Sequence, residues 1–381
     1  MNDAYTWMAT AAFGIEGLVA DELRALSARN VRCENGRVFF EGDAVLGAKA
    51  NLWLRCADRV FLVMGEFPAA TFDELFEGVR ALPWGDFLPK DASFDVARAK
   101  SINSKLFSLS DSQAITKKAI AEAMKRKYKA DWFQETGARF PVEVALNQDV
   151  ATVSVDASGT GLHRRGYRPM TAEAPLRETI AAALVRLSYY RGGIPLHDPL
   201  CGSGTLPIEA AMAAKNIAPG LLRSFVSEIW PLYKGGAWEA LRQEAIALKR
   251  TEPIENITGT DIDERALLMA RRHAQLAGVE RDIHFQRMDV RDISSKKAKG
   301  QIITNPPYGQ RLGDKKSAEK LAEVMGRAFE KLPGWFVGVI TADTDFPKHF
   351  GRRAKKNRKL FNGKIQCYYY QFDPPERTQR R

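Results

Sequence analysis

The chain has 381 residues and is 45% hydrophobic, which is enough for two or three domains with substantial cores. No stretch approaches the roughly 18 apolar residues of a membrane span, and we expect no signal peptide. The formal net charge of +11 favours a polyanionic partner, most simply nucleic acid, although ordinary solubility also explains it. The four cysteines form no CxxC pair and only five histidines are present, so we expect no metal site and a reducing, cytoplasmic environment.

The N-terminal part predicts two α+β domains. In residues 1–65, a helical run at 17–28 precedes a strand-like run at 37–40. A second domain is expected over residues 66–165. Its predicted elements are a strand at 93–99, a basic helix at 111–129, and a hairpin with strands 142–146 and 151–155.

Basic side chains are concentrated in two places in this part. In the helix at 111–129, Ile115, Ala119 and Met124 are predicted to face inward. Its basic residues then project outward: Lys117, Lys118, Lys125, Arg126, Lys127 and Lys129. The glycine-punctuated segment 161–168 carries arginines, a His and a Tyr, which suit phosphate contact and base stacking. A solvated linker is the alternative interpretation of that segment.

From residue 166 onward, strands, glycine loops and helices alternate, which predicts a parallel sheet covered by helices. Near the C-terminus, Asn362-Gly363 is a strong hairpin signal, so we expect a terminal antiparallel hairpin ending in a strand at 367–372. We therefore expect a third domain over 166–381, a doubly wound Rossmann-like α/β sheet with a terminal β-hairpin.

Residues 196–211 run from a strand through a glycine loop into a helix, and glycine lets the backbone pass close to a ligand. A dinucleotide site would carry a third glycine where this chain has Pro207, and the Lys-Ser/Thr pair of a P-loop is missing. A cofactor without pyrophosphate fits better, and S-adenosylmethionine is such a molecule. Asp198, at the end of the strand, can serve its ammonium end. We interpret Cys201 as a packing residue.

Further acidic side chains follow the next predicted strands. Asp261 is expected to hold ribose hydroxyls, whereas Asp263 is a weaker candidate because it can cap the helix that starts at Glu264. Asp289 can accept a hydrogen bond from an adenine amino group while the Val290 N–H reaches the ring.

The tetrapeptide Asn305-Pro306-Pro307-Tyr308 follows an apolar strand, and its two prolines, which lack N–H groups, end that strand. The turn fixes an amide and two carbonyls at one point, which forms a pocket for a flat group bearing an NH₂. The Asn305 oxygen and the Pro306 carbonyl can each accept one N–H, and Tyr308 can stack on the face. The tetrapeptide resembles the motif of amino-methyltransferases, which methylate exocyclic amines of nucleobases or glutamine.

The four motifs in this order resemble the class I S-adenosylmethionine-dependent methyltransferases over about residues 170–372. The stretch between Gly204 and Asp261 is longer than the dinucleotide fold usually has, and the N-terminal half is basic. Residues 101–106 and 113–119 match the THUMP pattern, so the resemblance is to a narrower family. Together these features resemble the THUMP-domain RNA methyltransferases, close to the bacterial 23S rRNA guanine-N2 methyltransferase family. That resemblance implies a ferredoxin-like domain over 1–65 and a THUMP domain that binds structured RNA over 66–165.

The resemblance also implies roles for individual residues. Cofactor binding is implied for Asp198, Cys201, Gly202, Ser203, Gly204, Thr205, Asp261, Ile262, Asp289, Val290 and Asn305. Catalysis is implied for Asn305, Pro306 and Tyr308. RNA contact is expected from Ser104, Lys105, Lys117, Lys118, Lys125, Arg164, Arg165 and Arg168.

The leading hypothesis is methylation of a guanine N2 amine in 23S rRNA. Methylation of a guanine N2 in tRNA, or of an adenine N6 in a nucleic acid, is the alternative within the same class. A cytosine-C5 enzyme would need a nucleophilic Cys beside a proline, and residues 305–309 contain none. The alternative from another class is a non-catalytic RNA-binding assembly factor that retains a cofactor fold.

Overall fold

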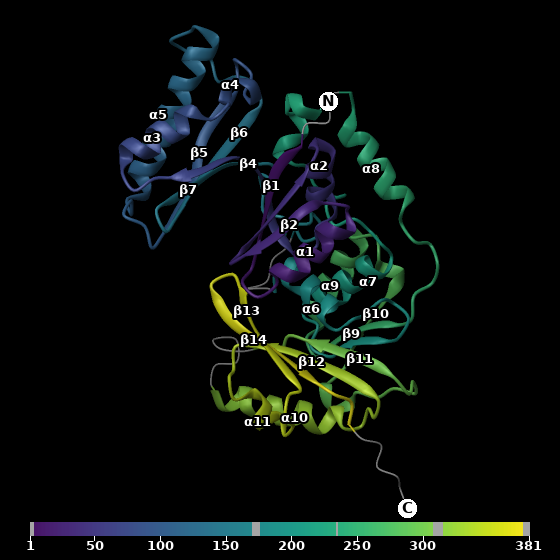
Figure 1. Cartoon of the computed structure of the whole chain (residues 1–381). Coiled ribbons are helices and arrows are strands. Elements are labelled where there is room, and N and C mark those ends of the chain that lie inside the picture. The colour runs from purple at the N-terminus through teal and green to yellow at the C-terminus, as the bar shows by residue number, and fades with distance from the viewer. Residues whose placement is uncertain (1–3, 170–175, 234, 308–314, 376–381) are drawn as a thin grey trace, which may run out of the picture. The chain divides into compact units, whose positions relative to one another are not determined.

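The computed structural model describes residues 4–169, 176–233, 235–307 and 315–375 (Figure 1). The chain forms two compact units. The first contains residues 1–10, 20–162 and 224–244, and the second contains 11–19, 163–223 and 245–381. Residues 224–244 thus fold with the first unit, although the sequence placed them in the third domain. Within the described residues, no helix is long and apolar enough to cross a membrane.

The first unit is built on one seven-stranded sheet in the order β2-β3-β1-β4-β7-β6-β5. Its strands are β1 (Tyr5–Ala11), β2 (Arg29–Glu34), β3 (Arg37–Gly42), β4 (Ala57–Pro68), β5 (Ser93–Ile102), β6 (Arg139–Asn147) and β7 (Val150–Asp156). The helices mostly within this unit are α1 (Glu16–Ala25), α2 (Ala44–Trp53), α3 (Phe72–Ala81), α4 (Trp84–Phe87), α5 (Leu109–Tyr128) and α8 (Ala237–Ala247). Short 3₁₀ turns are η1 (Val226–Ile229) and η2 (Pro231–Tyr233).

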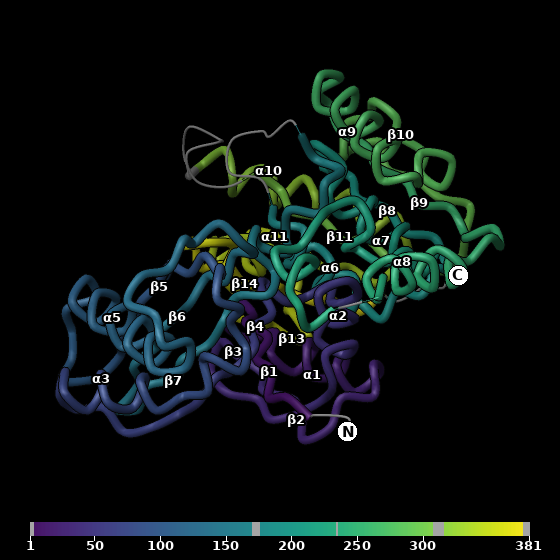
Figure 2. Tube along the Cα trace, turned by 90° about the horizontal axis from the view of Figure 1, so that it is seen from above, coloured from purple at the N-terminus to yellow at the C-terminus, as the bar shows by residue number. Residues whose placement is uncertain are grey.

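Strand β4 runs through residue 65 and pairs with β7, so one continuous sheet joins the two predicted N-terminal domains. The division between those domains at residue 65 stays a prediction. The predicted β6–β7 hairpin is present, and its turn residues Gln148 and Asp149 both have positive φ, 53° and 61°, which suits the right-handed twist of the two strands. Helices α3 and α4 both pack against α5, and α5 lies beside β5 (Figure 2).

Helix α5 begins two residues before its predicted start, because Ser108 caps it by accepting a hydrogen bond from the Asp111 N–H. Ala119 and Met124 are buried as predicted, and Ile115 is half-buried. The helix therefore presents its lysines to solvent along the opposite face.

The second unit is a seven-stranded sheet in the order β10-β9-β8-β11-β12-β14-β13. Its strands are β8 (Leu196–Asp198), β9 (Ile257–Asp261), β10 (Ile283–Arg287), β11 (Gly300–Thr304), β12 (Trp335–Thr341), β13 (Lys356–Asn362) and β14 (Ile365–Phe372). Its helices are α6 (Glu178–Leu187), α7 (Thr205–Ala214), α9 (Glu264–Leu276), α10 (Lys315–Phe329) and α11 (Phe346–Phe350), with 3₁₀ turns η3 (Glu280–Asp282) and η4 (Val290–Asp292).

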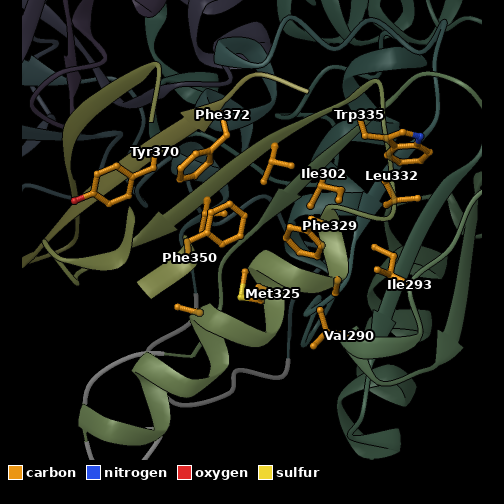
Figure 3. Packing of buried hydrophobic residues seen from close by; sticks show 14 of the residues in the cluster. Val290, Ile293, Ile302, Met325, Phe329, Leu332, Trp335, Phe350, Tyr370 and Phe372 are labelled. Atoms are coloured by element: carbon orange, nitrogen blue, oxygen red, sulfur yellow. The ribbon is translucent and has the colours of Figure 1, made fainter. Parts of the chain in front are cut away.

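Strands β8 to β12 are parallel, and β14 joins them antiparallel through the hairpin with β13. Figure 1 shows α10 and α11 on one face of this sheet and α6, α7 and α9 on the other. The predicted doubly wound sheet with a terminal hairpin is therefore confirmed. In the core under α10, Met325 and Phe329 pack against Ile302 of β11 and Phe372 of β14 (Figure 3). This packing fixes β11, which leads directly into Asn305.

Candidate functional site

A cavity of about 400 Å³ lies at the carboxyl ends of β8, β9 and β11. Strand β8 lies between β9 and β11 in the sheet. From β8 the chain first adds β9 and β10 on one side and then β11 and β12 on the other. Such a reversal of strand order is the topological switch point where open α/β sheets bind ligands. The cavity is lined by Leu176, Asp198, Leu200, Cys201, Gly202, Ser203, Thr205, Leu206, Asp261, Ile262, Asp263, Ala266, Met269, Asn305 and Pro307.

The glycine loop after β8 needs its two glycines for different reasons. Gly204 has φ +81°, and a Cβ there would lie 2.9 Å from the Ala270 Cβ, so this glycine permits close packing against α9. Gly202 has φ +50° and open space around the position of a Cβ. The Gly202 N–H donates to Asp261 Oδ2 at 2.8 Å, which ties the loop to the end of β9. Gly202 lines the cavity, whereas Gly204 acts through packing.

Two carboxylates at the end of β9 line the cavity. Asp261 Oδ1 accepts from the Asp263 N–H at 3.0 Å, in addition to the bond from Gly202. Asp263 Oδ1 accepts from the Arg265 N–H at 2.9 Å and caps α9, as the sequence indicated. Both carboxylates retain acceptor capacity toward the cavity. Ribose binding by Asp261 stays a prediction that this position favours.

Asp198 is the buried acid of the cavity, with 2% of its surface exposed. Its Oδ1 accepts from Thr304 Oγ1 at 2.7 Å and from the Leu200 N–H at 3.3 Å. Burial raises the pKa of Asp198 to about 7, and the hydrogen bond from Thr304 opposes that rise. A cationic group in the cavity would shift this acid to its carboxylate form.

Cys201 lines the same cavity and is 7% exposed. Burial raises the pKa of its thiol well above the ordinary value, and the charges of Asp198 and Asp261 add to that effect. The thiol is therefore protonated at neutral pH and is not activated as a nucleophile.

The structure does not bring Asp289 and Val290 to the cavity lining. Asp289 binds Arg291 instead, with its Oδ1 2.9 Å from Nε and its Oδ2 2.6 Å from Nη2. This pairing with Arg291 lowers the pKa of Asp289. Val290 is 6% exposed and packs in the core under α10. Adenine contact by these two residues stays a prediction, and it would require Asp289 to exchange Arg291 for the ligand.

Asn305 follows β11 and lines the cavity with Pro307. Its Oδ1 is buried and accepts no hydrogen bond from any described residue. An unpaired buried acceptor costs about 1–3 kcal/mol, so it is most readily explained where a ligand supplies the donor. Pro306 is buried beside it. Tyr308 lies outside the described residues, so its stacking role stays a prediction.

The predicted RNA contacts of the first unit lie mainly on its surface. Lys117 and Lys118 are exposed, with their Nζ atoms 6.0 Å and 5.8 Å from the ring centroids of Phe94 and Phe76. Lys105 is also exposed. Lys125 forms a surface ion pair with Glu122 at 3.0 Å. Ser104 has a structural contact, because its Oγ accepts from the Asp149 N–H at 3.1 Å and holds the β6–β7 turn.

Of the predicted RNA contacts in the second unit, one is exposed and two have side chains buried in ion pairs. Arg164 is exposed. The Arg165 side chain is 2% exposed, and its Nε donates to Glu209 Oε1 at 3.4 Å. The Arg168 side chain is 5% exposed and pairs with Glu178 at 3.1 Å. RNA contact by Arg165 stays a prediction, and its charge is already paired with a buried carboxylate of α7.

Sequence reasoning missed the apolar lining of the cavity. Leu176, Leu200 and Leu206 lie on it, as do Ala266 and Met269 of α9. The spacing of Ala266 and Met269, three residues apart after Asp263, was an available signal, because it places both on one helix face. Thr304, which donates to Asp198, was also missed because it lies inside a buried strand.

The acidic strand ends, the glycine loop, the apolar wall and the unpaired amide oxygen form a mixed cavity that suits S-adenosylmethionine, with its charged amino-acid end, ribose and flat adenine. Among the described residues, no cluster of His, Cys, Asp or Glu is arranged to hold a metal. The fold and this cavity define a class I S-adenosylmethionine-dependent methyltransferase.

Comparison with known families places the chain more narrowly. Residues 165–371 match the UPF0020 family model, described as "RMKL-like, methyltransferase domain". Residues 6–61 match the RlmL ferredoxin-like domain and residues 69–156 match the THUMP domain. The chain belongs to this RlmK/L-like family of THUMP-domain methyltransferases, and the expected family is confirmed.

Two curated relatives are named as RNA methyltransferases. The chain is 46% identical to "Putative RNA methyltransferase YpsC" of Bacillus subtilis (strain 168), over 99% of this chain and 98% of that protein. It is 34% identical to "Ribosomal RNA large subunit methyltransferase K/L" of Syntrophotalea carbinolica, over 99% of this chain but 54% of that protein. With these relatives, the chain is an S-adenosylmethionine-dependent RNA methyltransferase.

Solved structures agree with the fold and the cofactor. The crystal structure of SMU.472 complexed with SAH has a TM-score of 0.92 and 43% identity, covering 98% of this chain and 99% of that chain. A structure from Listeria monocytogenes str. 4b F2365, named as a predicted N6-adenine-specific DNA methylase, has a TM-score of 0.92 and 44% identity, covering 98% of this chain and 97% of that chain.

Proposed function

We propose that this enzyme methylates the exocyclic N2 amine of a guanine in 23S rRNA. The observation that carries the proposal is the buried Asn305 Oδ1 at the edge of the cavity, which accepts no hydrogen bond from any described residue. An exocyclic amine presents the N–H that this oxygen needs. The name of the 34% identical relative supports a ribosomal substrate, but this chain spans about half of that protein, so the rRNA target belongs to the proposal.

In this proposal the cofactor supplies a methyl group activated on a sulfonium. Asp198 holds the ammonium end and Asp261 the ribose hydroxyls. Asn305 Oδ1 and the Pro306 carbonyl each accept one N–H of the target amine. That arrangement orients the nitrogen lone pair, which is otherwise delocalised into the ring, so that positioning and preorganised dipoles provide the acceleration. No strong base is required, because the amine proton can leave to solvent after methyl transfer.

The target base must leave its stack to place its amine at Asn305, as in other base-modifying enzymes. Tyr308 is proposed to stack on the extruded base. The basic surface of the first unit is proposed to bind the structured RNA around it.

Adenine-N6 methylation is the second candidate, favoured by the name of the 44% identical Listeria structure. The Asn305 and Pro306 acceptors would serve either purine amine. Guanine-N2 methylation of tRNA uses the same geometry. Nucleoside mass spectrometry of rRNA and tRNA from a deletion strain distinguishes these three reactions. It identifies both the methylated nucleoside that is missing and the RNA that lacks it.

The site itself is tested with Asn305→Ala in the purified enzyme. Its acceptor matters most as the amine becomes tetrahedral, so we expect the single-turnover rate to fall by about 10²-fold or more while the RNA dissociation constant stays nearly unchanged. Asn305→Asp is the matched control, because it keeps an acceptor and should retain some activity. N2-methylguanosine is the expected product. Formation of N6-methyladenosine would overturn the guanine assignment.

Isothermal titration separates the enzyme from a non-catalytic assembly factor. The wild-type protein should bind S-adenosylmethionine, and methyl transfer to RNA should depend on Asn305. Absence of cofactor binding would support the non-catalytic alternative.

A further inference from the structure

A second and larger cavity, of about 730 Å³, lies in the same unit as the cofactor cavity. Leu176 lines both cavities, so the two share a wall. Residues 163–166, 168 and 169 of the segment before α6 form one side, and Asn362 and Ile365 of the β13–β14 hairpin contribute another. The cavity is therefore placed next to the methyl-transfer site without being part of it.

The lining of this second cavity is strongly cationic. Four arginines line it, Arg164, Arg165, Arg168 and Arg177, against one carboxylate, Glu178. Two of the four have carboxylate partners, since Arg165 pairs with Glu209 and Arg168 with Glu178. Arg164 and Arg177 form no ion pair with any described carboxylate. The cavity thus carries net positive charge that the described residues do not neutralise.

Arg168 gives an independent indication of an anionic ligand. Its side chain is 5% exposed, and its Nη1 is held by the Leu176 carbonyl and by Glu178, both at 3.1 Å. Its Nε and Nη2 are buried and donate to no described residue. Buried guanidinium N–H groups without acceptors are costly, and phosphate oxygens pair with such a fork.

Arg177 is held in place from two sides. Its backbone N–H donates to Asn362 Oδ1 at 3.1 Å. Its guanidinium lies over the hairpin turn, because a Cβ on Gly363 would be 3.4 Å from Arg177 Nη2. The terminal hairpin therefore positions a half-buried cation at the wall of the cavity, which reduces the entropy lost when a ligand binds.

We propose that this cavity binds the RNA backbone on one side of the extruded target nucleotide, with Arg164 and Arg177 as its phosphate contacts. The inference rests on the proposed function, because it assumes that a base enters the neighbouring site. A nucleotide turned out of its stack carries its flanking phosphodiesters with it, and the shared wall at Leu176 leaves them beside the cationic cavity. The cavity would then select a strand whose backbone is bent at the target.

The test compares Arg164→Ala and Arg177→Ala with Arg327→Ala in the full chain. Arg327 lies on α10 with a 78% exposed side chain and lines neither cavity, so it controls for the loss of one positive charge. Each cavity variant should weaken RNA binding and lower kcat/KM about tenfold, as expected for losing one charged hydrogen bond. Cofactor affinity should stay unchanged, and Arg327→Ala should behave like the wild type.

A chemically altered RNA shows whether the contact is direct. Replacing one phosphodiester beside the modified nucleotide with a neutral methylphosphonate should lower the RNA affinity of the wild-type enzyme about as much as the Arg177→Ala change does. The same replacement should lower the RNA affinity of the Arg177→Ala variant only slightly further, because the arginine that contacts this phosphate is already absent. A loss of equal size in wild type and variant at every flanking linkage would overturn the inference.

Two further outcomes are distinguishable. If the variants methylate RNA normally while Arg177→Ala loses binding of inorganic phosphate, the cavity serves a free anion and the inference is wrong. If arginine-dependent RNA binding is found but the wild-type enzyme transfers no methyl group, backbone binding by the cavity is supported while the proposed function fails.

Discussion

Asp261 connects the glycine loop to the cavity, because one carboxylate oxygen accepts from Gly202 and the other from Asp263. Asp261→Ala should therefore disorganise the loop as well as remove an acceptor for ribose hydroxyls. Charge-assisted hydrogen bonds contribute about 1.5–3 kcal/mol, so we expect S-adenosylmethionine affinity to fall at least tenfold in isothermal titration. Glu264→Ala, three residues further along the chain and outside the lining, should leave affinity unchanged. Equal affinity for wild type and Asp261→Ala would exclude this residue from the cofactor site.

Asp198 makes the stability of the cofactor-free protein depend on pH. Burial raises its pKa from 3.8 to about 7, so the folded state holds this proton more tightly than the unfolded chain. The resulting stabilisation is present below pH 3.8 and is lost as the pH rises toward 7. Asp198→Asn keeps an oxygen acceptor for Thr304 but cannot ionise. In urea unfolding between pH 5 and 8, the variant should gain stability relative to the wild type as the pH rises, and parallel curves would contradict this.

The sequence predicted individual residues well where position along a strand decides their place. Asp198, Asp261 and Asn305 each end or follow a parallel strand, and such ends meet at one edge of the sheet. It did not reveal surroundings that depend on distant partners. Arg165 is buried because Glu209, 44 positions later, supplies its carboxylate, and no local pattern reports that pairing.

At the scale of elements, local turn chemistry explains what was predictable. The hairpins β6–β7 and β13–β14 both form, with residues at the turns that tolerate positive φ, including Gly363 at +66°. The placement of residues 224–244 was not predictable, because contacts with residues distant in sequence bury this segment. The Trp230 indole stacks on Phe140 and donates to the Arg139 carbonyl in the first unit. Neither contact leaves a periodic signal in the sequence.

Helix α7 is anchored to the preceding segment by a buried group of polar side chains. Glu209 Oε1 accepts from Tyr167 at 3.0 Å and from Arg165 at 3.4 Å, and all three side chains are almost fully buried. Glu209→Ala removes the carboxylate while leaving the Arg165 charge inside, so we expect it to cost about 3–5 kcal/mol of unfolding free energy. Urea denaturation measures this loss. Glu264→Ala breaks only a surface pair and should cost under about 1 kcal/mol.

For the whole molecule, the second unit is discontinuous in sequence, with residues 11–19, 163–223 and 245–381 together. A fragment that began at residue 170 would lack Arg165 and Tyr167 and would leave Glu209 without these partners. Truncation therefore cannot separate RNA binding from catalysis in this chain. Point substitutions in the intact chain can.

The basic surface of the first unit should make RNA binding depend on salt. With a formal charge of +11, the full chain should bind RNA with an affinity that falls steeply as salt rises, because each phosphate contact releases counterions. Lys117 and Lys118 are exposed on α5. If both contact phosphates, replacing both with Ala should reduce the slope of log affinity against log salt by about 1.5–2.

The control replaces Lys249 and Lys296, two exposed lysines to which we assign no RNA contact. Both double variants remove the same charge, so a general loss of electrostatic attraction would weaken them equally. A reduced slope only in the α5 variant, with unchanged cofactor affinity, assigns phosphate contact to that helix. An α5 variant that binds RNA with the slope of the control would exclude α5 and would leave the cationic cavity beside the active site as the stronger candidate for backbone contact.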